Sequence, residues 1–170
     1  ILRPVMSKIG KDWERGKLSI ATEHVASNVA QTLVKMIIEQ VSGSRNKKKV
    51  MLCVPMGEEH HIGCDVLETY LTRKGFKVFN MGISMPTESI IEFIKIKKPN
   101  VVLISITIQD NILAGQRLVK KIRKQNKIPI LIGGHAIQRE DHPKFEGKVV
   151  GDVSLEDIPK ILRKIHLEIQ

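Results

Sequence analysis

The apolar residues of this chain follow two different patterns. Up to about residue 41 they recur at the spacing of an α-helix, and one predicted stripe consists of Val29, Leu33, Ile37 and Val41. Gly16 and Ser19 interrupt this helical segment, and serine is a common residue at a helix N-cap. Two helices with one apolar face each need a partner. We expect that partner to be the rest of the chain, a second chain, or helices outside this sequence.

After a polar, basic stretch at 43–49, short apolar runs alternate with longer helical stretches. Strands are predicted at 50–54, 77–80, 100–107, 128–132 and 149–150, and helices at 62–74, 88–97, 112–124 and 154–166. This alternation is typical of right-handed βαβ units. The sequence therefore predicts an α/β fold, in which a partial helical bundle precedes a five-stranded parallel doubly wound (Rossmann- or flavodoxin-like) sheet. The expected parts are a helical cap at 1–43, a linker at 44–49 and the sheet domain at 50–170.

Composition narrows the class of protein. Aromatic residues make up 4% of the chain and hydrophobic residues 42%, so Ile, Val and Leu must build the core, as in a parallel sheet buried on both faces. No apolar run approaches the roughly 20 residues of a membrane helix, and no signal-like segment opens the chain. We therefore expect a cytoplasmic protein without membrane contact. The formal charge of +10 comes from basic residues that have no aromatic residues interleaved with them. This favours a lysine-rich surface over nucleic-acid binding. Cys53 lies in an apolar run and is expected in the core.

The loop after the first predicted strand holds the densest candidate chemistry. It runs from Pro55 to Gly63 and contains two carboxylates and two imidazoles between glycines. Ligands of doubly wound sheets bind at such loops, beyond the carboxyl ends of the strands. These residues leave three interpretations open: a polar surface loop, a zinc site without clear third and fourth ligands, or a single axial histidine oriented by a nearby carboxylate.

The order of residues in this loop resembles a known motif. Glu58-x-His60-x-x-Gly63 is similar to the Asp-x-His-x-x-Gly motif of cobalamin-binding domains, with Glu in place of Asp. The resemblance implies that His60 replaces the benzimidazole base of the cofactor as the lower ligand of cobalt, oriented by Glu58. Counting back from Gly63 selects His60, which leaves His61 as the bystander.

Two further signals of that family follow in order. Ser105-Ile106-Thr107 stands after the third predicted strand, where the family has Ser-x-Leu or Ser-x-Thr, and Gly133-Gly134 follows the fourth. The resemblance implies that the displaced nucleotide tail of the cofactor enters a slot beside the sheet. Glycines leave room for a planar ring against the backbone, and the two hydroxyls are available to a tail rich in acceptors.

The helical segment bears on the function. Trp13 is followed after a fixed interval by Glu23 and His24, and a core tryptophan with a polar surface pair would explain them. The spacing also resembles that of adenosylcobalamin photoreceptors of the CarH/LitR type. That resemblance implies that Trp13 and Glu23 contact the adenosyl group, and that His24 ligates the vacated upper face of cobalt after photolysis.

The resulting expectation is a regulatory module without enzymatic activity that binds adenosylcobalamin and senses light. Homo-oligomers would form through the helical part, and DNA would be bound only through a domain that this sequence does not contain. The alternative is a corrinoid carrier of methyl groups in a methyltransferase system. A third possibility, the cobalamin domain of a mutase, would require a substrate barrel.

Overall fold

The structure, a computed structural model, describes residues 2–39, 48–138, 143–151 and 153–165. The helices are α1 (Leu2–Glu14), α2 (Ile20–Glu39), α3 (Ile62–Arg73), α4 (Thr87–Lys97), α5 (Ile112–Gln125) and α6 (Ile158–Lys164). The strands are β1 (Lys49–Cys53), β2 (Lys77–Asn80), β3 (Val101–Ser105), β4 (Ile130–Gly133) and β5 (Lys148–Val149). Short 3₁₀ turns at Gln109–Asn111 (η1) and His135–Ile137 (η2) follow β3 and β4. Among the described residues, no helix is long and apolar enough to span a membrane.

The five strands form one parallel sheet in the order β2-β1-β3-β4-β5, which confirms the predicted doubly wound fold. The third strand is shorter than predicted, because it ends at Ser105 rather than at Thr107. The backbone amides of Thr107 and Ile108 donate to the Glu58 carboxylate and not to a neighbouring strand. The chain therefore leaves the sheet where the candidate site begins.

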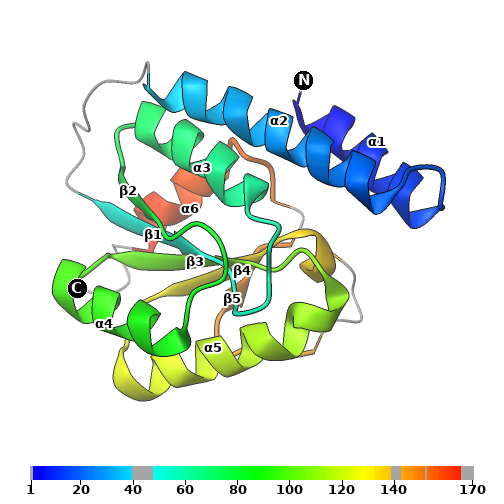
Figure 1. The fold of residues 1–170 in the computed structure, drawn as a ribbon. Helices are drawn as coiled ribbons and strands as arrows, with labels where there is room; N and C mark the ends of the chain where they lie inside the picture. Colours follow the sequence, from blue (N-terminus) through cyan, green and yellow to red (C-terminus); the bar gives the residue numbers. More distant parts are fainter. Residues whose placement is uncertain (1, 40–47, 139–142, 152, 166–170) are drawn as a thin grey trace.

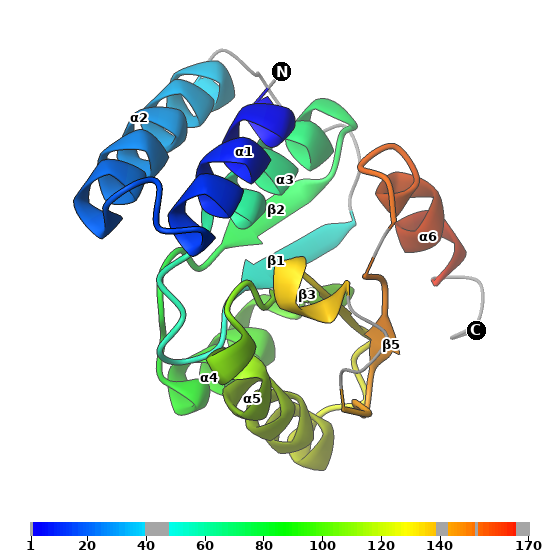
Figure 2. The same ribbon diagram turned by 90° about the vertical axis from the view of Figure 1, so that its right-hand side faces the viewer.

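Helices cover both faces of the sheet. Successive side chains of a strand point to opposite faces, so Met51 and Cys53 pack on the α4 and α5 side while Val50 and Leu52 pack on the α3 and α6 side. Figures 1 and 2 show these two helical layers with the sheet between them. Burial on both faces explains why β1 reads as a continuous apolar run, and it confirms Cys53 as a core residue.

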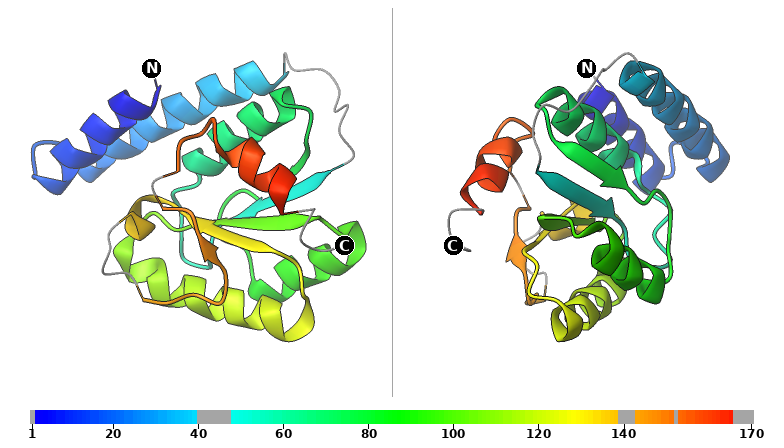
Figure 3. Two further views of the ribbon diagram at one scale, coloured as in Figure 1. Left: turned by 180° about the vertical axis from the view of Figure 1, so that it is seen from behind. Right: turned by 90° about the vertical axis from the view of Figure 1, so that its left-hand side faces the viewer.

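The N-terminal helices form an additional layer outside α3 (Figures 1 and 3). The Ser19 hydroxyl accepts the backbone N–H of Thr22 at 3.1 Å, which confirms the predicted cap of α2. Gly16 has a φ of +69° in the turn between the two helices, a conformation that glycine adopts without strain. Lys49 already belongs to β1, and most of the predicted linker at 44–49 lies outside the described residues.

The predicted apolar stripe of α2 was wrong as a packing face. Val29 and Leu33 are 55% and 51% exposed, whereas Ala30 and Val34 are buried. The Ile37 side chain and Val41 lie outside the described residues. The buried face also carries Glu23, and this polar residue breaks the apolar periodicity by which a buried face is recognised. Hydrophobic spacing therefore selected the neighbouring face.

Replacing a buried residue of α2 tests this packing. We expect Val34→Asp to lower the free energy of unfolding by about 2–4 kcal/mol, because it buries an unpaired carboxylate. Val29→Asp, on the exposed face, is the matched control and should change stability by less than about 0.5 kcal/mol. Urea denaturation followed by circular dichroism measures both. Equal losses in the two variants would contradict the observed orientation of α2.

Candidate functional site

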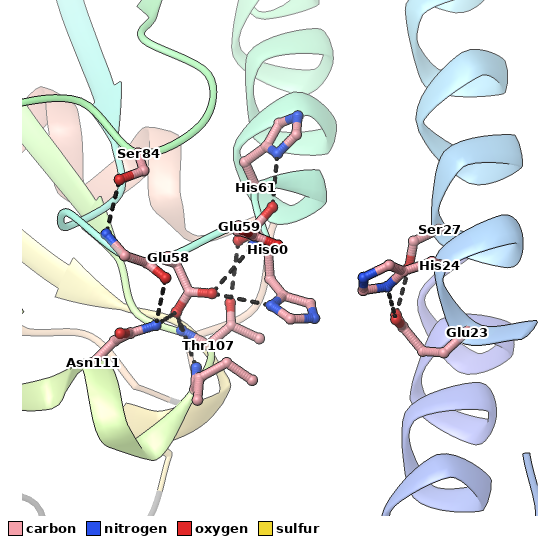
Figure 4. Close-up of polar contacts among 12 residues, drawn as sticks. Glu23, His24, Ser27, Glu58, Glu59, His60, His61, Ser84, Thr107 and Asn111 are labelled. Atoms are coloured by element: carbon pink, nitrogen blue, oxygen red, sulfur yellow. Dashed lines mark hydrogen bonds and ion pairs between the residues drawn. The ribbon is translucent and has the colours of Figure 1, made fainter. Parts of the chain in front are cut away.

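A buried carboxylate organises the loops at the carboxyl end of the sheet. Glu58, in the loop after β1, is 0% exposed. Its oxygens accept hydrogen bonds of 2.9–3.1 Å from the backbone N–H groups of His60, Thr107 and Ile108, from His60 Nδ1 and from Asn111 Nδ2 (Figure 4). One side chain thus connects the loop after β1 with the loop after β3.

These hydrogen bonds fix the protonation of Glu58. Burial alone would raise its pKa, but the donors, with His60 the strongest among them, lower the pKa to about 2. An ionised carboxylate only accepts hydrogen bonds, so His60 must carry its proton on Nδ1. The Nε2 lone pair of neutral His60 is therefore available to a metal, an arrangement usual for metal-binding histidines.

The two adjacent histidines point in different directions. The partly buried His60 ring projects from the loop toward α2, and the hydrogen bond with Glu58 raises its pKa against the effect of burial. His61 turns along α3, with Nδ1 at 3.1 Å from the Glu59 carbonyl and Nε2 at 3.6 Å from Asp65. The geometry therefore offers only His60 to a ligand above the sheet edge.

A second histidine–carboxylate pair faces His60 from α2 (Figure 4). Glu23 is 7% exposed and accepts hydrogen bonds from His24 Nδ1 at 2.9 Å and from the Ser27 hydroxyl at 2.6 Å. Burial raises the pKa of Glu23, but the bonds from Ser27 and His24 outweigh it and leave the pKa lowered. Glu23 also raises the pKa of His60 electrostatically, so the two pairs share one environment.

Among the described residues, no hydrogen bond joins Trp13 to this cluster. It lies partly buried on α1, and its carbonyl accepts the backbone N–H of Gly16 in the turn that follows. Of the residues predicted from the helical segment, the structure therefore brings Glu23 and His24 to the site, and joins to them Ser27.

Four of the remaining predicted residues line a cavity of about 380 Å³ on the α3 and α6 face, next to the loop of His60. Its lining includes Gly63, Ser105, Gly133 and Gly134. A cavity of this size is within the usual range for small-molecule and cofactor sites. Thr107 is not part of the lining. Its hydroxyl instead donates to the His60 carbonyl at 3.5 Å and so contacts the loop after β1.

Gly134 is required by the packing of the loops, apart from its predicted role toward a ligand. Its φ is +108°, and a Cβ there would lie 2.3 Å from the backbone oxygen of Ile106. A side chain at this position would collide with the neighbouring loop before it met any ligand. At Gly133, in contrast, a Cβ would make an ordinary 3.6 Å contact with Val150.

Two supporting residues were missed by the sequence analysis. Asn111 donates to Glu58 from η1, and Ser84, in the loop after β2, accepts the Gly57 N–H at 2.8 Å. Both are common polar loop residues far from residue 58 in sequence, so only their position in the fold reveals their role. In the part of the chain that the structure describes, no group of three or more His, Cys, Asp or Glu is placed to hold a metal ion, so the zinc interpretation is not supported.

Fold and site together define a class. They describe a doubly wound α/β domain with one oriented histidine nitrogen in a loop that leads into a cavity, which suits a metal-bearing cofactor that needs a single ligand from the protein. The sequence matches the B12 binding domain family over residues 48–154 and a further B12 binding domain family over residues 1–38. The chain belongs to the B12 binding domain family, and its cofactor is cobalamin.

Individual relatives are distant. The trimethylamine corrinoid protein of Methanosarcina barkeri is 23% identical over 95% of this chain and 78% of its own length. The HTH-type transcriptional repressor CarH of Myxococcus xanthus is 24% identical over 80% of this chain and 46% of its own length. The monomethylamine corrinoid protein of Methanosarcina barkeri has the same fold, with a TM-score of 0.74 and 16% identity over 99% of this chain and 80% of that one.

Glu58 predicts a specific dependence of stability on pH. Its pKa in the folded chain, about 2, lies below the ordinary value of 4.5, so the carboxylate stabilises the fold above pH 4.5. This contribution is lost as the pH falls toward 2. We expect Glu58→Gln to cost about 1–3 kcal/mol at pH 7, since an amide would place donors against donors. The difference in the free energy of unfolding between Glu58→Gln and wild type should be smaller at pH 3.

Exposed Glu59 supplies the matched control. Glu59→Gln removes the same charge from the same loop and should leave the free energy of unfolding nearly unchanged at both pH values. Urea denaturation at pH 7 and pH 3 measures the four differences. Equal effects of the two substitutions at pH 7 would contradict the central role of Glu58.

Proposed function

We propose that this chain is a corrinoid methyl carrier, which holds its cofactor for partner methyltransferases and is not itself a catalyst. The proposal rests mainly on the free Nε2 of His60, in a loop that continues into the cavity-lining residues Ile62 and Gly63, together with the similarity to trimethylamine and dimethylamine corrinoid proteins of Methanosarcina. When bound, the cobalt of the corrinoid accepts a methyl group and passes it on.

In this proposal His60 is the lower ligand and Glu58 its orienting partner. Glu58 keeps the Nδ1 proton of His60 in place, so that Nε2 would be the atom that holds the cobalt. Glu58 would thereby orient the ring and leave the lone pair of Nε2 directed at the metal.

The other predicted site residues receive roles that follow from their placement. Gly63 and Gly133 leave the cavity open, and Ser105 presents a hydroxyl to the nucleotide tail. Gly134 and Thr107 contribute to the structure around the site. Gly134 allows two loops to approach closely, and Thr107 holds the His60 loop through a hydrogen bond.

Removal of His60 tests the assignment of the lower ligand. In wild-type protein prepared with ¹⁵N-labelled histidine, the electron paramagnetic resonance spectrum of the cobalt(II) form should show splitting by a ¹⁵N nucleus. His60→Ala should lose that splitting and bind cobalamin at least about tenfold more weakly. His61→Ala, the neighbouring control, should retain both. Unlabelled-nitrogen splitting in the wild type would assign the lower ligand to the cofactor's own base.

The Glu23–His24 pair keeps light sensing as a second candidate function. This pair faces His60, on the side from which an upper ligand of the metal would come, and Nδ1 of His24 is held by Glu23. His24 is therefore the proposed upper ligand after loss of an adenosyl group. The similarity to trimethylamine and dimethylamine corrinoid proteins favours the carrier instead.

Light separates the two functions. For a carrier loaded with adenosylcobalamin, green light should cleave the cobalt–carbon bond without changing the oligomeric state, and His24→Ala should leave the photoproduct spectrum unchanged. For a sensor, the photoproduct should be a stable bis-histidine form that His24→Ala abolishes, with a shift in size-exclusion elution. The second pattern would replace the carrier as the function while leaving His60 as the lower ligand.

A further inference from the structure

The inner wall of the cavity next to the His60 loop is apolar, because three neighbouring strands each contribute one leucine to it. Leu52, Leu103 and Leu131 occupy paired positions on β1, β3 and β4, and they form a row across the middle of the sheet. All three belong to the same buried core cluster on the α3 and α6 face. The inner wall against which a ring would lie is therefore aliphatic.

Further apolar side chains close the sides of this cavity. They come from α1, from α3, and from the segment after β5 up to the first residue of α6: Met6, Val66, Leu67, Val150, Val153 and Ile158. Met6 belongs to α1, so the N-terminal helices contribute to the same wall as the sheet domain. The lining also includes two exposed polar residues, His135 at the start of η2 and Gln138 directly after it.

Few polar groups inside the cavity remain available to a ligand. Among the described residues, no hydrogen bond is formed by the Ser105 hydroxyl, which makes it available. Of the nearby strand carbonyls, that of Gly133 already accepts one hydrogen bond, from the Ile106 N–H at 2.8 Å. Burial raises the pKa of the Cys64 thiol far above its ordinary range, so it stays a protonated, weak donor.

We propose that this cavity selects corrinoids by their lower base, favouring benzimidazole-type bases over adenine. The inference rests on the proposed function, because it assumes that the displaced base enters the cavity. A benzimidazole buries an apolar ring and one acceptor nitrogen, which the Ser105 hydroxyl satisfies. Adenine adds an exocyclic amine and further ring nitrogens, for which the row of leucines offers no partner. Each buried polar group left unpaired should weaken binding about tenfold or more.

The test compares three corrinoids with the same upper ligand: cobalamin, its analogue with adenine as lower base, and cobinamide, which lacks the nucleotide tail. Their affinities for the apoprotein are measured by equilibrium dialysis. We expect cobalamin to bind at least about tenfold more tightly than the adenine analogue, and more tightly than cobinamide. Equal affinity for cobalamin and the adenine analogue, or for cobalamin and cobinamide, would overturn the proposal.

The same samples separate failure of this inference from failure of the proposed function. If all three corrinoids bind equally with ¹⁵N-histidine on cobalt, the cavity is not selective but His60 remains the ligand. If none of them acquires the ¹⁵N-histidine splitting, the assignment of His60 fails and the selectivity fails with it.

A matched pair of variants tests whether the apolar lining causes the selection of the lower base. Leu67→Gln places an amide in the cavity wall, whereas Ile161→Gln makes the same kind of change on α6, against the same core cluster but outside the lining. Leu67→Gln should reduce the cobalamin-to-adenine affinity ratio several-fold, and Ile161→Gln should leave it unchanged. Because both affinities are measured on the same variant, any loss of stability affects both and cancels in their ratio. An unchanged ratio in Leu67→Gln would remove the lining as the basis of selection.

Discussion

The buried carboxylate of Glu58 is the interaction on which the arrangement of the site depends. It gathers backbone amides from two loops and the side chains of His60 and Asn111, and in return those donors keep it ionised at a pKa of about 2. Because an ionised carboxylate cannot donate, it determines which nitrogen of His60 carries the proton. The direction of the free nitrogen of His60 therefore follows from the neighbouring charge of Glu58.

The longer side chain of Glu58, in place of the aspartate usual in the motif, is compatible with this geometry. Glu58 reaches both His60 and the start of the loop after β3, so one residue orients the histidine and limits the length of β3. A shorter carboxylate in the same loop would have less reach toward both groups. The substitution thus preserves the orienting hydrogen bond on which the resemblance depended.

The N-terminal helices contribute to the site in two ways, one near His60 and one in the cavity lining. The sequence resemblance did not distinguish these two contributions. Glu23, held by Ser27 and His24, lies on the buried face of α2 and affects His60 electrostatically, while Met6 of α1 lines the cavity. Trp13, the residue most suggestive of a light sensor, forms no hydrogen bond with that pair among the described residues. The helical layer therefore contributes both to the surroundings of His60 and to the cavity wall, which is compatible with a carrier and leaves sensing as the second candidate.

The sequence by itself determined the parallel five-stranded sheet, the order of its elements, the core position of Cys53 and the cobalamin motif around His60. These depend on local periodicity and on short spacings, which are visible in one dimension. Tertiary structure alone decided which face of α2 is buried, because Glu23 interrupts the apolar pattern of that face. It also decided the roles of Asn111, Ser84 and Gly134, whose partners are distant in sequence. The leucine row of the cavity likewise exists only once three strands pair in register, since no local pattern places Leu52 beside Leu103 and Leu131.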